Sequence, residues 1–224
     1  FLVALFGFLN LSEKTIIIVE NHYLGSVIEK RQFDTFYHEH PRTYSLKSFT
    51  KISKLLGVNL ISYKFPKRYG GNIRVIFSNN LTKKINFKKI MKQEKLYFIK
   101  INKLNKDIET WKNKKLKIIN ALVKKFGPLP AKAFPGRAAI LIKMLNLNKQ
   151  QISAIFERDK SIKIGNYAPG TNIPIISDKN LKKIHKNIPI INLAWHISKE
   201  IKIYLKKSFI KNKVIDILTQ QDFR

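Results

Sequence analysis

The chain has 224 residues, of which 44% are hydrophobic and 11% aromatic. This composition excludes a disordered chain and is sufficient for one large folded domain or two small ones. Its 44 basic and 14 acidic side chains give a formal net charge of +30, and it contains no cysteine. Disulfides and thiolate metal sites are therefore excluded, and we expect a reducing compartment, the cytoplasm.

The large positive charge has two alternative origins. A nucleic-acid-binding surface typically concentrates arginine, whereas 37 of the 44 basic residues here are lysines spread along most of the chain. Many isoleucines and asparagines accompany them, which favours a general composition bias at solvated positions. We therefore expect no specific nucleic-acid partner. A non-enzymatic nucleic-acid-binding protein is the alternative, and the charge alone predicts weak, salt-sensitive binding of polyanions.

The first residues predict a helix followed by a strand. The apolar run 1–11 lacks a starting Met, a basic region and a small-residue cleavage site. It is typical of a buried helix rather than a signal peptide or membrane span, and its abrupt start suggests that the chain is a fragment. The β-branched run Thr15–Glu20 predicts a strand buried on both faces of a parallel sheet. Ligands bind beyond the carboxyl ends of such strands, so Asn21, His22 and Tyr23 are expected on the ligand side.

The tetrad Tyr37-His38-Glu39-His40 combines two imidazoles, a carboxylate and a phenol. Histidine exchanges a proton near neutral pH, and an adjacent carboxylate favours its basic role, so the tetrad indicates general-base chemistry. The alternative is a solvated polar turn. A metal site that adds His22 is less favoured, because Pro41 and Arg42 interrupt the His-Glu-x-x-His pattern of metalloproteases.

The following segments predict a helix, two strands and a connector. Ser45–Leu56 has a suitable N-cap and apolar residues at helical spacing, and Gly57 suits the left-handed position that ends a helix. Val58–Phe65 and Asn72–Ser78 predict an antiparallel pair of strands. Thr82–Lys125 is lysine-rich, with an apolar stripe typical of a long helical connector. We therefore place three domains at 1–80, 81–125 and 126–224.

The last hundred residues predict a second small α/β unit, because strand and helix patterns alternate. Phe126–Lys132 is rich in Gly and Pro and predicts a loop. His185 and His196 favour structural roles, and a position lining a cleft is the alternative for His196. The expected helices are Arg137–Leu147, a segment from Leu181 and Ile197–Leu205, and the expected strands are Ile152–Glu157, Ile188–Leu193 and Val214–Leu218.

Several motifs occur together in this chain. They are Glu20–Tyr23, Phe33–His40, Tyr44–Leu46, Gly70–Arg74, Pro130–Ala133, Lys163–Pro174 and Asn192–His196. In these motifs and their order the chain resembles the S-adenosylmethionine-dependent sugar C-methyltransferases, which act on nucleotide-linked keto-deoxysugars. The resemblance implies an α/β fold: the C-terminal part of a class I methyltransferase Rossmann-like sheet, a helical connector and a second small Rossmann-like domain.

The resemblance also implies functional residues. His40 matches the family's general base, Glu39 its charge partner or a co-base, and Tyr37 a hydrogen-bond donor near the enolate that attacks the sulfonium methyl group. We assign His38 a structural hydrogen bond, since it points the opposite way if the segment is extended. Substrate contacts are expected from His22, Arg74, Lys132, Arg137 and His196.

The implied cofactor is S-adenosylmethionine and the implied partner is a nucleotide-sugar. The family's cysteine-rich zinc domain and glycine-rich cofactor loop have no counterpart here, so we expect both to lie upstream and this fragment alone to be inactive. No metal is expected in the chain itself. Tyr69-Gly70-Gly71-Asn72 departs from the His-Gly-Gly-Ser of many relatives, which leaves a substrate contact by this loop open. A catalytically idle sugar-nucleotide-binding module is the remaining alternative.

Overall fold

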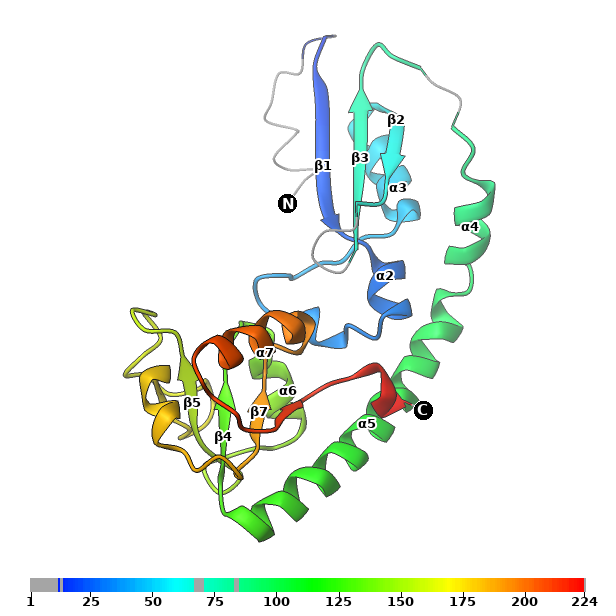
Figure 1. Cartoon of the computed structure of the whole chain (residues 1–224). Helices are drawn as coiled ribbons and strands as arrows, with labels where there is room; N and C mark the ends of the chain where they lie inside the picture. The colour runs from blue at the N-terminus through cyan, green and yellow to red at the C-terminus, as the bar shows by residue number, and fades with distance from the viewer. Residues whose placement is uncertain (1–11, 13, 67–70, 83–84, 224) are drawn as a thin grey trace. The chain divides into compact units, whose positions relative to one another are not determined.

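The computed structural model describes residues 12, 14–66, 71–82 and 85–223 (Figure 1). The helix expected over residues 1–11 lies outside the described residues, as does the 67–70 part of the loop between the two expected strands. The chain forms two compact units, Phe1–Leu104 and Asn105–Arg224. Helix α5 (Tyr97–Phe126) contributes to both. The boundaries near residues 80 and 125 concern family domains and remain a prediction.

Unit 1 is built on a three-stranded sheet in the order β1-β3-β2. Strand β3 (Asn72–Ser78) runs antiparallel to both β1 (Ile16–His22) and β2 (Asn59–Lys64). β1 and β2 therefore run parallel to each other, with the antiparallel strand between them. The predicted antiparallel pairing of the second and third strands is confirmed.

The prediction for the first strand is wrong in part. β1 occupies the expected position, but in the described part of the chain it pairs antiparallel with β3, and Ile16 and Ile18 are 54% and 62% exposed. A β-branched run is compatible with a strand that buries one face or two. Its composition therefore did not fix the number of buried faces.

Alternation along the strands gives the sheet of unit 1 two different faces. Ile17, Val75 and Phe77 share the apolar face and pack with Phe49 of helix α3 (Leu46–Leu56) in one core cluster. This core fixes the register between β1 and β3, since a slip of one residue would turn these side chains to the other face.

The second face of the sheet is polar at the carboxyl end of β1. The register places Glu20 opposite Arg74 and His22 opposite Asn72. Residues opposite each other in an antiparallel pair point to the same face, and so do residues two positions apart. These four side chains are therefore neighbours on one face of the sheet.

Helix α3 has the caps that its sequence predicts. The Ser45 hydroxyl accepts a hydrogen bond from the backbone N–H of Ser48, and Gly57 adopts a left-handed conformation with φ of 65°. A second cap comes from α4 (Lys88–Glu94), because the Glu94 carboxylate accepts hydrogen bonds from the backbone N–H groups of Leu46 and Lys47 at 2.7 and 2.8 Å. The carboxylate also complements the positive end of the α3 dipole.

Unit 2 contains a five-stranded parallel sheet in the order β6-β5-β4-β7-β8. This order reverses direction between β4 and β7, as in Rossmann-like α/β folds. The strands are β4 (Leu129–Lys132), β5 (Ile152–Glu157), β6 (Ile175–Ser177), β7 (Ile190–Asn192) and β8 (Val214–Asp216), and the helices are α6 (Ala138–Met144) and α7 (Ser198–Lys207).

Two expectations for unit 2 are wrong. Phe126–Lys132 was expected to be a loop, but Leu129–Lys132 is the fully buried central strand β4. Pro130 is tolerated because it lies where the register with β5 shifts, so the missing N–H breaks no regular ladder. The helix expected from Leu181 is the short 3₁₀ helix Asp178–Lys183, since the segment before β7 leaves little room for a longer helix.

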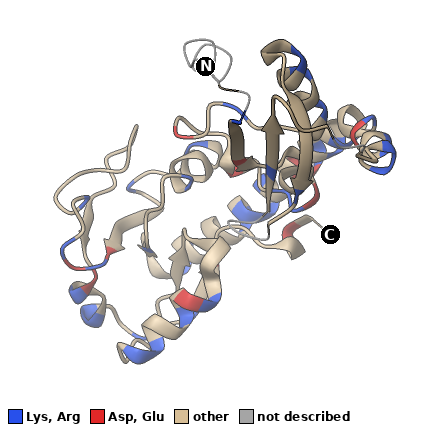
Figure 2. Cartoon of the chain, turned by 90° about the horizontal axis from the view of Figure 1, so that it is seen from above, with Lys and Arg blue, Asp and Glu red and all other residues tan. Residues whose placement is uncertain are grey.

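The lysine-rich connector forms two helices, α4 and α5, rather than one. Tyr97, Leu104 and Trp111 lie on its apolar stripe and are buried. The predicted packing face is therefore confirmed at these positions. In Figure 2 the Lys and Arg residues, coloured blue, are distributed over several helices and are not confined to one of them. A specific nucleic-acid surface remains an untested alternative.

Candidate active site

The segment between Leu24 and Tyr44 starts at the end of β1 and returns to it. The backbone N–H of Leu24 donates to the carbonyl of Tyr44 at 2.9 Å, and the N–H of Tyr44 donates to the carbonyl of His22 at 3.4 Å. Helix α2 (Leu24–Glu29), a 3₁₀ turn at Phe33–Thr35 and the tetrad lie between these contacts. Both ends of this segment are thus anchored beside the carboxyl end of β1.

The tetrad itself forms a tight turn, closed by a 2.8 Å hydrogen bond from the N–H of His40 to the carbonyl of Tyr37. The turn stacks the rings of Tyr37 and His40, with centroids 4.9 Å apart and planes at 24°. It leaves the side chain of His38 84% exposed. The His38 ring meets the Tyr37 ring edge-on, with centroids 5.6 Å apart. The expectation that His38 points the opposite way assumed an extended segment, whereas the tetrad is a turn.

Two further contacts extend this stack into a small cluster. The ring of His22 lies 4.6 Å from that of His40, centroid to centroid. The hydroxyl of Tyr37 donates to Glu39 Oε2 at 3.0 Å, and His38 Nε2 lies 3.9 Å from Glu39 Oε1. The structure therefore brings together His22, Tyr37, Glu39 and His40. A direct partnership between Glu39 and His40 remains a prediction.

Next to this cluster, Glu20 organises the polar face of the sheet. Its Oε2 accepts a hydrogen bond from Arg74 Nε at 2.7 Å and forms an ion pair with Arg74 Nη2 at 2.6 Å. Its Oε1 accepts a hydrogen bond from Asn72 Nδ2 at 2.8 Å. Arg74 keeps 42% of its side chain exposed. A ligand at Arg74 would therefore meet a guanidinium whose charge is largely balanced by Glu20.

A buried hydrogen-bond network anchors Tyr23, the residue that follows β1. The hydroxyl of Tyr97 donates to that of Tyr23 at 2.6 Å, which donates to Glu94 Oε1 at 3.2 Å. Burial raises the pKa of Tyr97 to about 12 and also raises the pKa of Tyr23. Both phenols are therefore neutral hydrogen-bond donors, and they connect the residue after His22 to the start of α3.

The predicted site residues of unit 2 have different surroundings. Lys132 is 1% exposed, and its Nζ donates to Asp178 Oδ2 at 2.7 Å and to the carbonyl of Phe156 at 3.2 Å. Tyr204 also donates to Asp178, at 2.6 Å. Although burial acts to raise it, the hydrogen bonds from Lys132 and Tyr204 hold the pKa of the Asp178 carboxyl below its usual range. A phosphate contact by Lys132 would require this pair to open.

Arg137 and His196 follow the two strands between which the sheet order reverses. The guanidinium of Arg137 lies over the Trp195 ring, 5.2 Å from its centroid. His196, the next residue, is exposed. Ligands of open α/β sheets bind at such reversal points. The positions of both side chains are therefore compatible with the predicted substrate contacts, which remain a prediction.

Two participants of this region, Glu20 and Asn72, were not among the predicted site residues. Glu20 was expected at the end of a strand, and both residues occur in motifs shared with the family, but neither was given a role. Period-2 alternation would have placed Glu20 on the face of His22. Nothing local could have placed Asn72 there, because that requires the pairing register of two distant strands.

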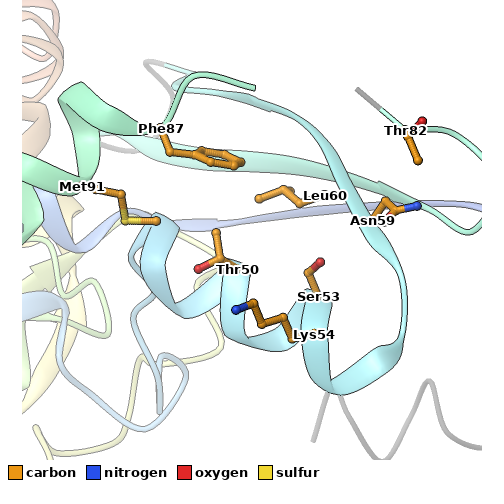
Figure 3. A pocket seen from close by; sticks show the side chains of 8 residues that line it. All are labelled: Thr50, Ser53, Lys54, Asn59, Leu60, Thr82, Phe87 and Met91. Atoms are coloured by element: carbon orange, nitrogen blue, oxygen red, sulfur yellow. The ribbon is translucent and has the colours of Figure 1, made fainter. Parts of the chain in front are cut away.

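Unit 1 also has a separate pocket of about 750 Å³ between α3, β2 and α4 (Figure 3). Leu60, Phe87 and Met91 give it an apolar lining. It lies near Asn59, which pairs with the last residue of β3, whereas Asn72 begins that strand. The pocket is therefore at the opposite end of the sheet from the tetrad cluster.

The sequence matches the C-methyltransferase C-terminal domain family over residues 67–214, which is well over half of the chain. The chain belongs to this family. Membership supports a C-methyltransferase, as the sequence predicted. The tetrad and His22 precede the matched residues, so their assignment depends on the geometry and on the motif. A search among curated proteins found no match.

Family membership implies S-adenosylmethionine as the methyl donor, but Gly25 and Gly71 of unit 1 leave no room for it beside the backbone. A site for this cofactor uses glycines that leave room for it next to the backbone. Here, an added Cβ at Gly25 would clash with Tyr97, and one at Gly71 would clash with Ser26. These glycines serve internal packing, and we assign no residue of the chain to the cofactor.

The described residues contain no group of three or more histidine, aspartate and glutamate side chains that is arranged to hold a metal ion. In the same part of the chain, every helix is too short or too polar to cross a membrane.

Proposed function

We propose that the protein methylates a carbon next to the keto group of a nucleotide-linked deoxysugar, with S-adenosylmethionine as methyl donor. Family membership supports methyl transfer to carbon. The sugar and the donor follow from the motifs that the chain shares with sugar C-methyltransferases. The tetrad cluster supports the chemistry that such a substrate needs first, which is removal of a weakly acidic C–H proton.

In this proposal His40 is the general base. Its imidazole takes the proton from the carbon next to the keto group, and the electron pair of that C–H bond moves into an enolate. The enolate carbon is then the nucleophile for methylation. His40 suits the role because Tyr37 and His22 hold its ring from two directions, which fixes the geometry of proton transfer.

Tyr37 and Glu39 would support this step. A neutral phenol can donate a hydrogen bond to the enolate oxygen, where negative charge develops. In the structure the Tyr37 hydroxyl donates to Glu39, so it would change partner when substrate binds. Glu39 is then left to balance the charge of the protonated imidazole.

In unit 1 the proposed substrate contacts are Arg74 and His22, on the polar face of its sheet. In unit 2, taken by itself, they are Arg137 and His196, which follow β4 and β7. A substrate contact by Lys132 requires its ion pair with Asp178 to open. The observation that carries the proposal is the stack of His22, His40 and Tyr37 beside the carboxylate of Glu39.

The base assignment is tested by hydrogen exchange that needs no methyl donor. In D₂O, the complete protein should exchange the proton next to the keto group of a nucleotide-linked keto-deoxysugar, and mass spectrometry would detect the deuterium. His40→Ala should abolish both this exchange and methyl transfer. The matched variant His38→Ala removes an exposed imidazole two residues away and should retain both. Normal exchange in His40→Ala would disprove the assignment.

A further inference from the structure

Asn72 has one hydrogen-bonding group that the described structure does not use. The residue is 7% exposed, and its Nδ2 donates to Glu20 Oε1 at 2.8 Å. Its Oδ1 is buried and receives no hydrogen bond from the described residues. A buried acceptor left without a donor destabilises a protein, so such atoms are rare and require an explanation.

The direction of this oxygen is fixed by its amide. The carboxylate of Glu20 can only accept, so the NH₂ group of Asn72 must face it and the carbonyl oxygen must point elsewhere. Asn72 is paired with His22, two residues further along β1 than Glu20. The oxygen is therefore directed away from Glu20, and the residue that carries it lies opposite His22, the last residue of β1, whose ring contacts His40.

The backbone around Asn72 holds this arrangement in place. The N–H of Asn72 donates to the carbonyl of Pro66 at 2.9 Å, and the carbonyl of Gly71 accepts from the N–H of Tyr23 at 3.3 Å. Gly71 has a φ of 125° and no room for a Cβ beside Ser26. The amide of Asn72 is thus presented from a firmly packed strand start, beside the histidine that contacts His40.

We propose that Asn72 Oδ1 accepts a hydrogen bond from a hydroxyl group of the sugar, and that it thereby selects substrates that carry this hydroxyl. The inference rests on the proposed function, because it places the sugar at the tetrad. A site built around a buried acceptor discriminates strongly against a ligand that lacks the matching donor, since the acceptor then stays unpaired. Asn72 is therefore a specificity-determining residue.

The test combines substrate and protein changes. The complete protein and Asn72→Ala are assayed with nucleotide-linked keto-deoxysugars that each lack a different hydroxyl group. In the unmodified protein, loss of one particular hydroxyl should lower kcat/KM about 10- to 100-fold. In Asn72→Ala the same loss should have little effect. The control Asn59→Ala, in β2, should keep the full discrimination.

The outcomes separate this inference from the proposed function. Suppose that the unmodified protein methylates a keto-deoxysugar and that Asn72→Ala shows the same discrimination among hydroxyl patterns as the unmodified protein. The inference is then wrong, and the proposed function stands. If the unmodified protein neither methylates nor exchanges the proton of any such sugar, both fall. Should Asn72→Ala fail to fold, Asn72→Leu, which is close to Asn in size and cannot accept a hydrogen bond, gives the same comparison. A melting temperature within about 3 °C of the unmodified protein confirms folding.

Discussion

The imidazole of His22, the last residue of β1, lies against the imidazole of His40, with ring centroids 4.6 Å apart and planes at 43°. Tyr37 stacks on His40 as well. A histidine on a turn has two rotatable side-chain bonds, and contacts from a strand and from its own turn restrict both. The cluster therefore orients a base through ring contacts from two separate parts of the chain.

We expect His22→Ala to lower kcat about 10- to 100-fold, because the ring of His40 loses its contact with the strand and the proton transfer loses alignment. His22→Phe restores a flat ring in the same place and should recover most of this loss. Steady-state kinetics of methyl transfer check the prediction. An increase in KM with unchanged kcat would show that His22 acts only as the proposed substrate contact and does not orient His40.

Tyr37→Phe tests the proposed stabilisation of the enolate. The variant keeps the ring that stacks on His40 and loses only the hydroxyl, so kcat should fall about 100-fold while KM changes little. Tyr63→Phe, which removes a hydroxyl bonded to the carbonyl of Asn86, is the matched control and should keep full activity. Unchanged kcat in Tyr37→Phe would remove the phenol from the mechanism.

The sequence predicted the elements whose signals are local. Helix α3 is an example, because Ser45 and Gly57 mark its ends and its apolar spacing marks its face. β4 was missed because Pro130 and Gly127 resemble loop residues, while burial in the centre of a parallel sheet outweighs that local preference. Tertiary context decides such cases.

The same distinction applies to the candidate site. The residue types of the tetrad indicated base chemistry before any fold was known. The contact between His22 and His40 depends on the return of the chain at Tyr44, and the contact between Glu20 and Asn72 depends on strand register. Neither follows from a local pattern, so the sequence predicted the reactive groups but not the side chains that orient them.

Glu94 tests how α3 is held in unit 1. Its carboxylate accepts hydrogen bonds from Leu46 and Lys47 backbone N–H groups and from the Tyr23 hydroxyl. Glu94→Ala leaves these donors without their acceptor and should lower the free energy of unfolding by about 2–4 kcal/mol. Hydrogen exchange of the α3 amides, followed by mass spectrometry, should become faster.

Glu109→Ala is the control for that experiment. Glu109 forms an exposed pair with Lys112 at 3.0 Å, one helical turn away, and such pairs contribute less than about 1 kcal/mol. Exchange in α3 should be unaffected by this change. Equal effects of the two variants on α3 exchange would show that the loss at Glu94 is a general effect of removing a carboxylate from a helix and not of losing the cap on α3.

The buried pair of Lys132 and Asp178 predicts a pH-dependent stability of unit 2. Asp178→Asn leaves the Lys132 ammonium buried without its counter-charge, which should cost about 3–5 kcal/mol at pH 7. The folded-state pKa of Asp178 is depressed, so its contribution is complete above the unfolded value of about 3.9 and is lost as the pH falls through the lower folded value.

Fluorescence of the two tryptophans, Trp111 and Trp195, follows urea unfolding of unit 2 selectively, because both lie in this unit. The stability difference between the unmodified protein and Asp178→Asn should be constant from pH 7 to about pH 5 and should shrink below about pH 4. Asp159→Asn alters the neighbouring exposed pair with Lys179 and should change stability far less, because water screens that pair. A difference at pH 3 as large as at pH 7 would show that the Asp178 side chain acts through its shape and not its charge.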